Sequence, residues 1–289
     1  MKYYDKIKRP IAFAFILLII LPALFGCSAP KSSEADLMSV HFIDVGQGDC
    51  ELVITPNGET MLIDAGVPDA GDDVVSYISS LGISEIDVFV ASHYHEDHIG
   101  GSHDVFKAFD ILSVLMLDTE VTTSCAKKLL DDVKEEESEV FYAKRGYEFS
   151  LGEAELLVLS PEKITDNGGN DDSIVLRMQY KDARYIFTGD AEKDAEEDML
   201  SFYDVTELSC DVLKLGHHGS RTSTTDEFIS AADPSIAVIS CANGNSYGHP
   251  HKETLERVGA RVAHIYRTDV FGSVVIVTDG YRIYIWDDI

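Results

Sequence analysis

The sequence is most informative at the run Ser92-His93-Tyr94-His95-Glu96-Asp97-His98-Ile99-Gly100-Gly101. Three histidines and an aspartate lie close together there, directly after an apolar stretch at 86–91. This pattern predicts a buried strand that ends in a loop. Because alternate residues of an extended chain share a face, His93 and His95 should point the same way, and the turn should bring Asp97 and His98 towards them. Imidazole and carboxylate groups suit zinc, manganese or iron, so the loop predicts a metal site.

The composition is that of a globular protein with a large acidic excess. The chain has 289 residues, of which 45% are hydrophobic, and this is enough for a sizeable core. Its 23 basic and 51 acidic residues give a formal net charge of −28. Such a chain lacks the basic surface that follows a nucleic-acid backbone, which argues against tight binding of long DNA.

Residues 1–26 have the pattern of a signal peptide. A basic segment at 2–9 precedes an apolar segment at 11–24, which is short for a membrane span. Gly26 and Cys27 follow it and resemble the cleavage site of a bacterial lipoprotein. The resemblance implies cleavage before Cys27 and a lipid on its sulfur. The secreted protein would then be anchored in membrane lipid at the extracellular face of the cytoplasmic membrane, with residues 27–37 as a linker. An uncleaved anchor helix is the alternative.

Apolar periodicity predicts many strands and a few helices in residues 38–289. Helices are expected at 73–81, 124–137, 193–202 and 225–232. Strands are expected at positions that include 61–63, 86–91, 139–142, 185–188, 212–215 and 236–239. Many strands with a few helices indicate two packed sheets with helices outside, in a single domain.

Two of the later strands also end in residues that suit metal binding. One ends at Gly189-Asp190, where the carboxylate either binds metal or caps the following helix. Another ends at Gly216-His217-His218-Gly219-Ser220. Two further motifs are Asp44-Val45-Gly46-Gln47-Gly48-Asp49, near the start of the folded body, and Tyr247-Gly248-His249-Pro250, near its end.

Together these motifs resemble the metallo-β-lactamase-fold hydrolases, and in particular the ComEC-type competence proteins, which are tied to DNA uptake. The resemblance covers nearly all of the chain after the leader. It implies an α+β fold, the four-layer αββα metallo-β-lactamase sandwich, in residues 38–289. It also implies two divalent metal ions, zinc or manganese, that convert water into the attacking hydroxide. The implied metal ligands are His93, His95, Asp97, His98, Asp190 and His217, with Asp190 matching the family's aspartate that bridges the two ions.

The resemblance also suggests roles around the metal ligands. We expect His217, the first histidine to leave its strand, to bind the second ion, and His218 to orient the substrate or carry a proton. Asp97, His218 and His249 are the candidate catalytic residues. His249 would contact a substrate phosphate or stabilise the leaving group, and its alternative is a surface histidine. Asp64 resembles an aspartate that fixes the tautomer of a ligand histidine.

The chain departs from the general superfamily at the first metal ion. Most members carry a lone histidine between the first and last motifs, whereas here no histidine lies between His103 and His217. Either Asn170, Asp171 or Asp172 supplies an oxygen ligand, or the first ion has only His93, His95 and Asp190. An oxygen-richer site would bind manganese relatively better than an all-histidine site.

The motifs favour an extracellular phosphodiesterase or nuclease, with DNA as a possible substrate. One alternative is a hydrolase of a small phosphoester, such as a choline-phosphate headgroup, or of a lactam. Another alternative, from a different class, is a surface-anchored binding protein with a decayed site. The sequence identifies no protein partner.

Overall fold

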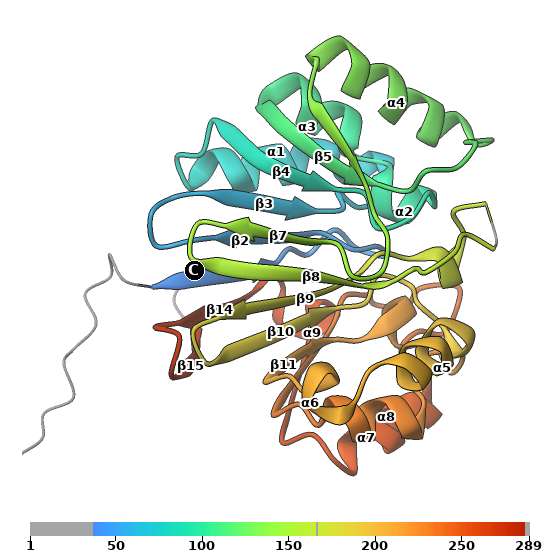
Figure 1. The fold of residues 1–289 in the computed structure, drawn as a ribbon. Helices are drawn as coiled ribbons and strands as arrows, with labels where there is room; N and C mark the ends of the chain where they lie inside the picture. The colour runs from blue at the N-terminus through green and yellow to red at the C-terminus, as the bar shows by residue number, and fades with distance from the viewer. Residues whose placement is uncertain (1–36, 166, 287–289) are drawn as a thin grey trace, which may run out of the picture. The chain divides into compact units, whose positions relative to one another are not determined.

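The computed structural model describes residues 37–165 and 167–286 (Figure 1). The predicted leader and all of the linker except Leu37 lie outside these residues. Two β-sheets pack against each other, and helices cover the outer face of each sheet (Figure 1). This arrangement confirms the predicted α+β sandwich. Among the described helices, none is long and apolar enough to cross a membrane.

The first sheet contains eight strands. They are β1 (Met38–Phe42), β2 (Glu51–Ile54), β3 (Thr60–Ile63), β4 (Glu85–Val90), β5 (Asp110–Met116), β6 (Glu139–Tyr142), β14 (Val274–Thr278) and β15 (Ile283–Trp286). Their order is β15-β14-β1-β2-β3-β4-β5-β6. Pairing is antiparallel from β15 to β3 and parallel from β3 to β6. Parallel neighbours need long connections, which contain the outer helices α1 (Gly71–Ser80), α3 (Ser102–Ala108) and α4 (Ser124–Glu136).

The second sheet contains seven strands. They are β7 (Glu148–Leu151), β8 (Ala154–Ser160), β9 (Val175–Tyr180), β10 (Ala183–Phe187), β11 (Val212–Lys214), β12 (Ile236–Ile239) and β13 (His264–Arg267). Their order is β13-β12-β11-β10-β9-β8-β7, antiparallel from β7 to β10 and parallel from β10 to β13. The helices on this side are α5 (Lys193–Phe202), α6 (Val205–Leu208), α7 (Asp226–Ala232) and α8 (Lys252–Gly259), and a short α9 (Thr268–Phe271) follows β13.

Strand β10 shows how alternation in the sequence builds two cores. Tyr185 and Phe187 point to one face, where Phe187 lies 6.2 Å from the ring of Phe42 in the first sheet. Ile186 points to the other face and belongs to the cluster under the outer helices, together with Phe228 of α7. Successive side chains of a strand face opposite sides, so a strand with helices on one side and a sheet on the other is apolar throughout. Each such large side chain contributes roughly 1.5–3 kcal/mol by burial.

Most of the elements predicted from the sequence are present, and α5, β6 and β12 have the predicted bounds. The sequence pattern did not predict α3 or β5. The helix passes into the strand through Phe109 alone, so neither glycine nor proline marks the change. Helix α8 was also missed. The cysteines at 50, 125, 210 and 241 are unpaired.

Candidate metal centre

The candidate site lies where parallel strands of both sheets end. Strand β4 leads into the loop of His93, and the same segment continues into the short helix α2 (Glu96–Ile99). In the second sheet, Asp190 follows β10 and His218 follows β11. The ends of parallel strands meet at one edge of a sheet, where ligand sites commonly form. The two sheets therefore each supply part of one site.

The first group of potential ligands comprises Asp97, His98, Asp190 and His218. Each offers one atom, and these atoms all lie within 4.8 Å of one another. His98 Nε2 is 3.1 Å from Asp190 Oδ1. His218 Nε2 is 3.3 Å from Asp97 Oδ2 and 3.6 Å from Asp190 Oδ1. Two imidazoles and two carboxylates suit a divalent ion such as zinc or manganese.

The second group comprises His93, His95 and Asp190, again within 4.8 Å. His93 Nε2 faces the other carboxylate oxygen, with 3.9 Å between it and Asp190 Oδ2. Asp190 therefore presents one oxygen to each group, which is the arrangement expected of a bridging carboxylate. It does not cap helix α5, whose N-cap residue is Glu192.

Unsatisfied polar atoms show that these residues fit metal ions. His93 Nε2, His98 Nε2, His218 Nε2 and Asp190 Oδ1 are buried and form no well-oriented hydrogen bond within the described chain, although His98 Nε2 and Asp190 Oδ1 are only 3.1 Å apart. Burying such an atom without a partner costs about 1–3 kcal/mol. Four of them in one cluster are accounted for if cations are their partners.

The histidine pair adopts an unusual backbone. His217 has φ 47° and ψ 49°, and His218 has φ 53° and ψ 26°, so both lie in the left-handed region. That conformation costs non-glycine residues roughly 1–2 kcal/mol each, and such strain is common at functional sites. It turns His218, which is buried, towards Asp97 and Asp190.

His217 takes a different direction. Its Nε2 lies 3.8 Å from Asp190 Oδ2, the oxygen that also faces His93, and its Nδ1 lies 2.7 Å from Glu192 Oε1. Because His218, and not His217, lies in the group with Asp97, His98 and Asp190, the structure favours His218 as the ligand of the second ion. The sequence pattern favoured His217. His217 stands instead beside the group of the first ion.

The 170–172 segment, expected to offer an oxygen ligand, is mostly occupied elsewhere. Asp171 Oδ1 accepts hydrogen bonds from the N–H groups of Glu192 and Ala195 at the start of α5. Asp172 accepts from backbone N–H groups of its own loop and belongs to neither ligand group. Asn170 does reach the site, because its Nδ2 lies 3.2 Å from His217 Nδ1 and its Oδ1 is buried without a partner in the described chain.

Asp64 holds His98 as expected. Its Oδ2 is 2.7 Å from His98 Nδ1, which leaves Nε2 facing the ligand group. Ser92 fixes the carboxylate in turn, since its backbone N–H donates to Oδ1 and its hydroxyl donates to Oδ2. A carboxylate behind a ligand histidine orients the ring and increases its basicity.

Asp49 and Lys214 form a second support, which the sequence motifs did not predict. Asp49 Oδ1 is 3.2 Å from His218 Nδ1, and that nitrogen also donates to the carbonyl of Ser240. Lys214 Nζ is 2.6 Å from Asp49 Oδ2 and donates to the carbonyl of Leu215. Both charged side chains are about 1% exposed. The available signal was a lysine inside the apolar strand 212–215, because a buried lysine needs a buried partner.

The surrounding charges explain how the site attracts cations. Burial disfavours a charge on Asp190, yet His98 and His218 beside it hold its pKa well below the usual range. Burial likewise disfavours a charge on His218, but Asp190 and Asp49 raise its pKa to about 10. The carboxylates therefore draw positive charge into the site, as protons or as metal ions in competition with them.

The ligand groups open into a pocket of about 310 Å³. It is lined by Gln47, His95, Glu96, Asp97, Asn170, Asp190, His217, His218, Tyr247 and His249. His249 stacks with the exposed ring of Tyr247 at a centroid distance of 5.6 Å. Burial, together with His217 beside it, lowers the pKa of His249 to about 4. His249 is therefore a neutral pocket residue rather than a surface histidine.

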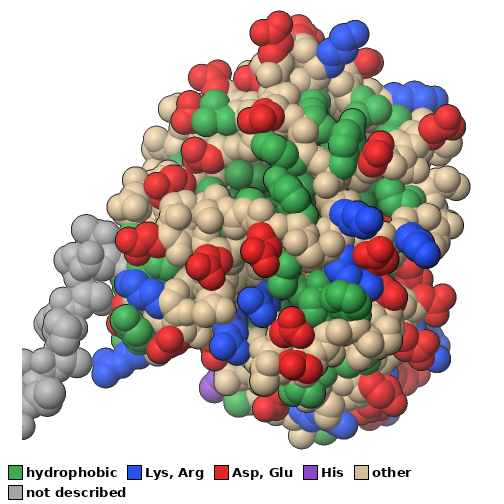
Figure 2. Space-filling model, viewed as in Figure 1, with side chains coloured by type: hydrophobic (Ala, Val, Ile, Leu, Met, Phe, Trp, Pro, Cys, Tyr) green, Lys and Arg blue, Asp and Glu red, His purple; other side chains and the backbone are tan. Residues whose placement is uncertain are grey.

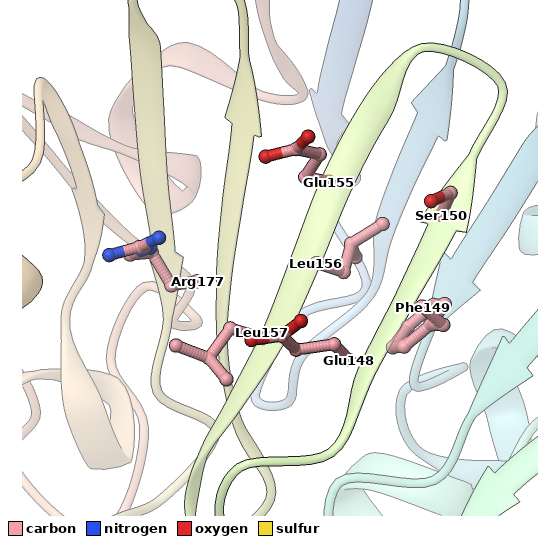
Figure 3. Close-up of a pocket in the computed structure, with 7 residues that line it drawn as sticks. All are labelled: Glu148, Phe149, Ser150, Glu155, Leu156, Leu157 and Arg177. Carbon is pink, nitrogen blue, oxygen red and sulfur yellow. The ribbon is translucent and has the colours of Figure 1, made fainter.

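A second hollow, of about 390 Å³, lies over β7, β8 and β9 (Figure 3). Its labelled polar side chains are Glu148, Ser150, Glu155 and Arg177. No histidine or cysteine lines it, so it lacks the ligand set of the first pocket.

Comparison with known proteins agrees with this geometry. Residues 43–242 match the family model of the metallo-beta-lactamase superfamily, and the chain belongs to that superfamily. The ComE operon protein 3 of Bacillus subtilis strain 168 is 31% identical over 275 residues, which are 89% of this chain and 34% of that protein. The competence protein ComA of Neisseria gonorrhoeae is 30% identical over 258 residues, again 89% and 34%. The chain thus spans about a third of the length of these relatives.

A solved structure supports the fold. YhfI of Bacillus subtilis, a metallo-beta-lactamase fold protein, aligns with a TM-score of 0.53 and 13% identity over 80% of this chain and 95% of its own. The resemblance to ComEC-type competence proteins and the predicted sandwich are therefore both confirmed.

Proposed function

We propose that this protein is a metal-dependent phosphodiesterase that binds two divalent ions. The main observation in support is Asp190, whose two oxygens face two separate groups of ligand atoms. Bound ions would supply Lewis acidity at the substrate oxygens and an activated water at neutral pH. His93, His95 and Asp190, with His217 adjacent, would hold one ion. Asp97, His98, Asp190 and His218 would hold the other.

The remaining pocket residues would position the substrate. His249 lines the pocket, and its ring lies 5.2 Å from that of His217. With a pKa of about 4, its imidazole is neutral near pH 7. It would therefore donate a hydrogen bond to the leaving-group oxygen rather than transfer a full proton. Asp64 and Asp49 would keep His98 and His218 in the tautomers that leave Nε2 free.

Similarity to competence proteins supports a phosphodiester substrate, with DNA among the candidates. The surface is less suited to a long polyanion, because acidic side chains are spread over the face shown in Figure 2. A small phosphoester, such as a choline-phosphate headgroup, is the second candidate on this ground. We further propose that lipid on Cys27 holds the body at the extracellular face of the cytoplasmic membrane.

Activity of the full-length protein tests the function. We would assay bis-p-nitrophenyl phosphate and single-stranded DNA with manganese or zinc added, and measure bound metal in parallel. Turnover that is lost in Asp190→Ala would support a metal phosphodiesterase, and the DNA assay would distinguish a nuclease. Bound metal without turnover of either substrate would refute the phosphodiesterase and favour the small-phosphoester hydrolase. Absence of both metal and turnover would favour the decayed binding protein.

A further inference from the structure

Gln47 lines the metal pocket and has no role in the chemistry described above. It belongs to the loop between β1 and β2, within the motif 44–49. Asp97, Asp190, His218 and His249 line the same pocket. Gln47 is thus a neutral amide within a group of carboxylates and imidazoles.

Backbone contacts hold Gln47 beside the loop that carries Asp97. At Gly48, φ is +156°, and a Cβ there would lie 2.2 Å from the carbonyl oxygen of Asp97. The N–H of Asp49 donates to that same oxygen at 3.2 Å. Only glycine allows this close approach. The motif 44–49 therefore packs against the segment that carries Asp97. Gln47 is the residue directly before Gly48, which makes the contact.

The side-chain amide is oriented by a single contact. The backbone N–H of Ala242 donates to Gln47 Oε1 at 3.2 Å. A backbone N–H can only donate, so the oxygen must face Ala242 and the Nε2 group must point elsewhere. Nε2 is buried and makes no hydrogen bond with any described residue. A buried donor without an acceptor, on a residue that lines a pocket, points to a ligand.

We propose that Gln47 binds substrate by donating a hydrogen bond from Nε2 to an anionic, nonbridging oxygen of the phosphoryl group. This inference rests on the proposed phosphodiesterase function. Glu96, Asp97 and Asp190 in the pocket all repel an anionic substrate. An uncharged amide donor attracts the phosphoryl oxygen without competing with the metal ions for the carboxylates, as a lysine or arginine would.

The test is calorimetric binding of inorganic phosphate to the metal-loaded, full-length protein, with KM and kcat measured separately. Gln47→Met removes the donor and keeps the side-chain length. Gln47→Glu keeps the acceptor for Ala242 but replaces the donor with a carboxylate that also repels phosphate, so it should weaken phosphate binding at least as much as Gln47→Met. The matched control is Gln179→Met, because Gln179 is another half-buried glutamine, on β9, whose Nε2 donates to the carbonyl of Lys181. Metal content and Tm are measured for every variant.

A hydrogen bond to a charged group corresponds to a roughly 10- to 150-fold change in affinity. We expect phosphate to bind that much more weakly to Gln47→Met, and KM to rise, while metal content and the Gln179→Met control stay unchanged. If Gln47→Met lowers the Tm, phosphate binding is compared at a temperature at which both proteins are folded. Phosphate affinity of Gln47→Met within twofold of that of the unaltered protein would overturn the proposal, and so would an unaltered protein that binds no phosphate. Because binding is measured without turnover, failure of the phosphodiesterase assay alone remains distinguishable.

Discussion

The buried pair of Lys214 and Asp49 supports the most demanding prediction. Replacing Lys214 with methionine removes the cation 2.6 Å from Asp49 Oδ2 and leaves that carboxylate about 1% exposed. Glu51 beside it is another buried acid and cannot supply the missing positive charge, whereas His218 Nδ1, 3.2 Å from the other carboxylate oxygen, supplies part of it. Removing one partner of a buried ion pair costs about 3–5 kcal/mol. Because His218 stays beside Asp49, we expect a loss at the lower end of that range, about 3 kcal/mol, in the free energy of unfolding.

Urea unfolding of the metal-free protein at pH 7 measures this loss. The control is Lys128→Met, since Lys128 is half-exposed and its pair with Asp132 is worth only about 0.3–0.5 kcal/mol. The double variant Lys214→Met/Asp49→Asn should be less destabilised than the sum of its single changes by about 0.5–3 kcal/mol, because it leaves no unpaired charge. A Lys214→Met variant as stable as the control would refute the reasoning.

Three more predictions follow from the site and its supports. His218→Ala should lower the bound metal from two ions to one, whereas His217→Ala should retain the second ion, as measured by metal analysis; equal losses would contradict the assignment. Gly48→Ala should destabilise the protein by about 1–3 kcal/mol in urea unfolding, because its Cβ overlaps the carbonyl of Asp97; a neutral effect would disprove the close contact. Burial lowers the pKa of His41 to about 4, below its unfolded value near 6.5, so its contribution of roughly 3 kcal/mol is present above pH 6.5 and is lost as the pH falls towards 4. His41→Asn should remove that part of the pH dependence of unfolding. An unchanged profile would show that His41 is not its source.

Local patterns in the sequence explain why much of the fold was predictable. Apolar stretches that end in ligand residues identified the ends of β4, β10 and β11, because the period of a strand and the chemistry of its last residue are local properties. Strand β5 was not predicted, because Phe109 gives no sign of a change from helix to strand.

The site was less predictable, because its details depend on backbone angles and distant contacts. His217 and His218 are chemically identical neighbours, and only their left-handed backbone separates their directions. Asp49 and Lys214 lie far apart in the chain and meet because the two sheets pack. Asp172 was a plausible oxygen ligand by type, but its loop uses both carboxylate oxygens for backbone N–H groups.

The ligands come from opposite sheets, and this has a consequence for stability. His93 and His98 follow β4 of the first sheet, whereas Asp190 and His218 follow strands of the second. A shared ion would therefore link the two sheets, which also pack against each other through Phe42 and Phe187. Each tenfold rise in free metal above its Kd would stabilise the folded chain by about 1.4 kcal/mol. At the extracellular location proposed above, the surrounding metal supply would therefore govern the protein's lifetime against proteases as well as its catalytic rate.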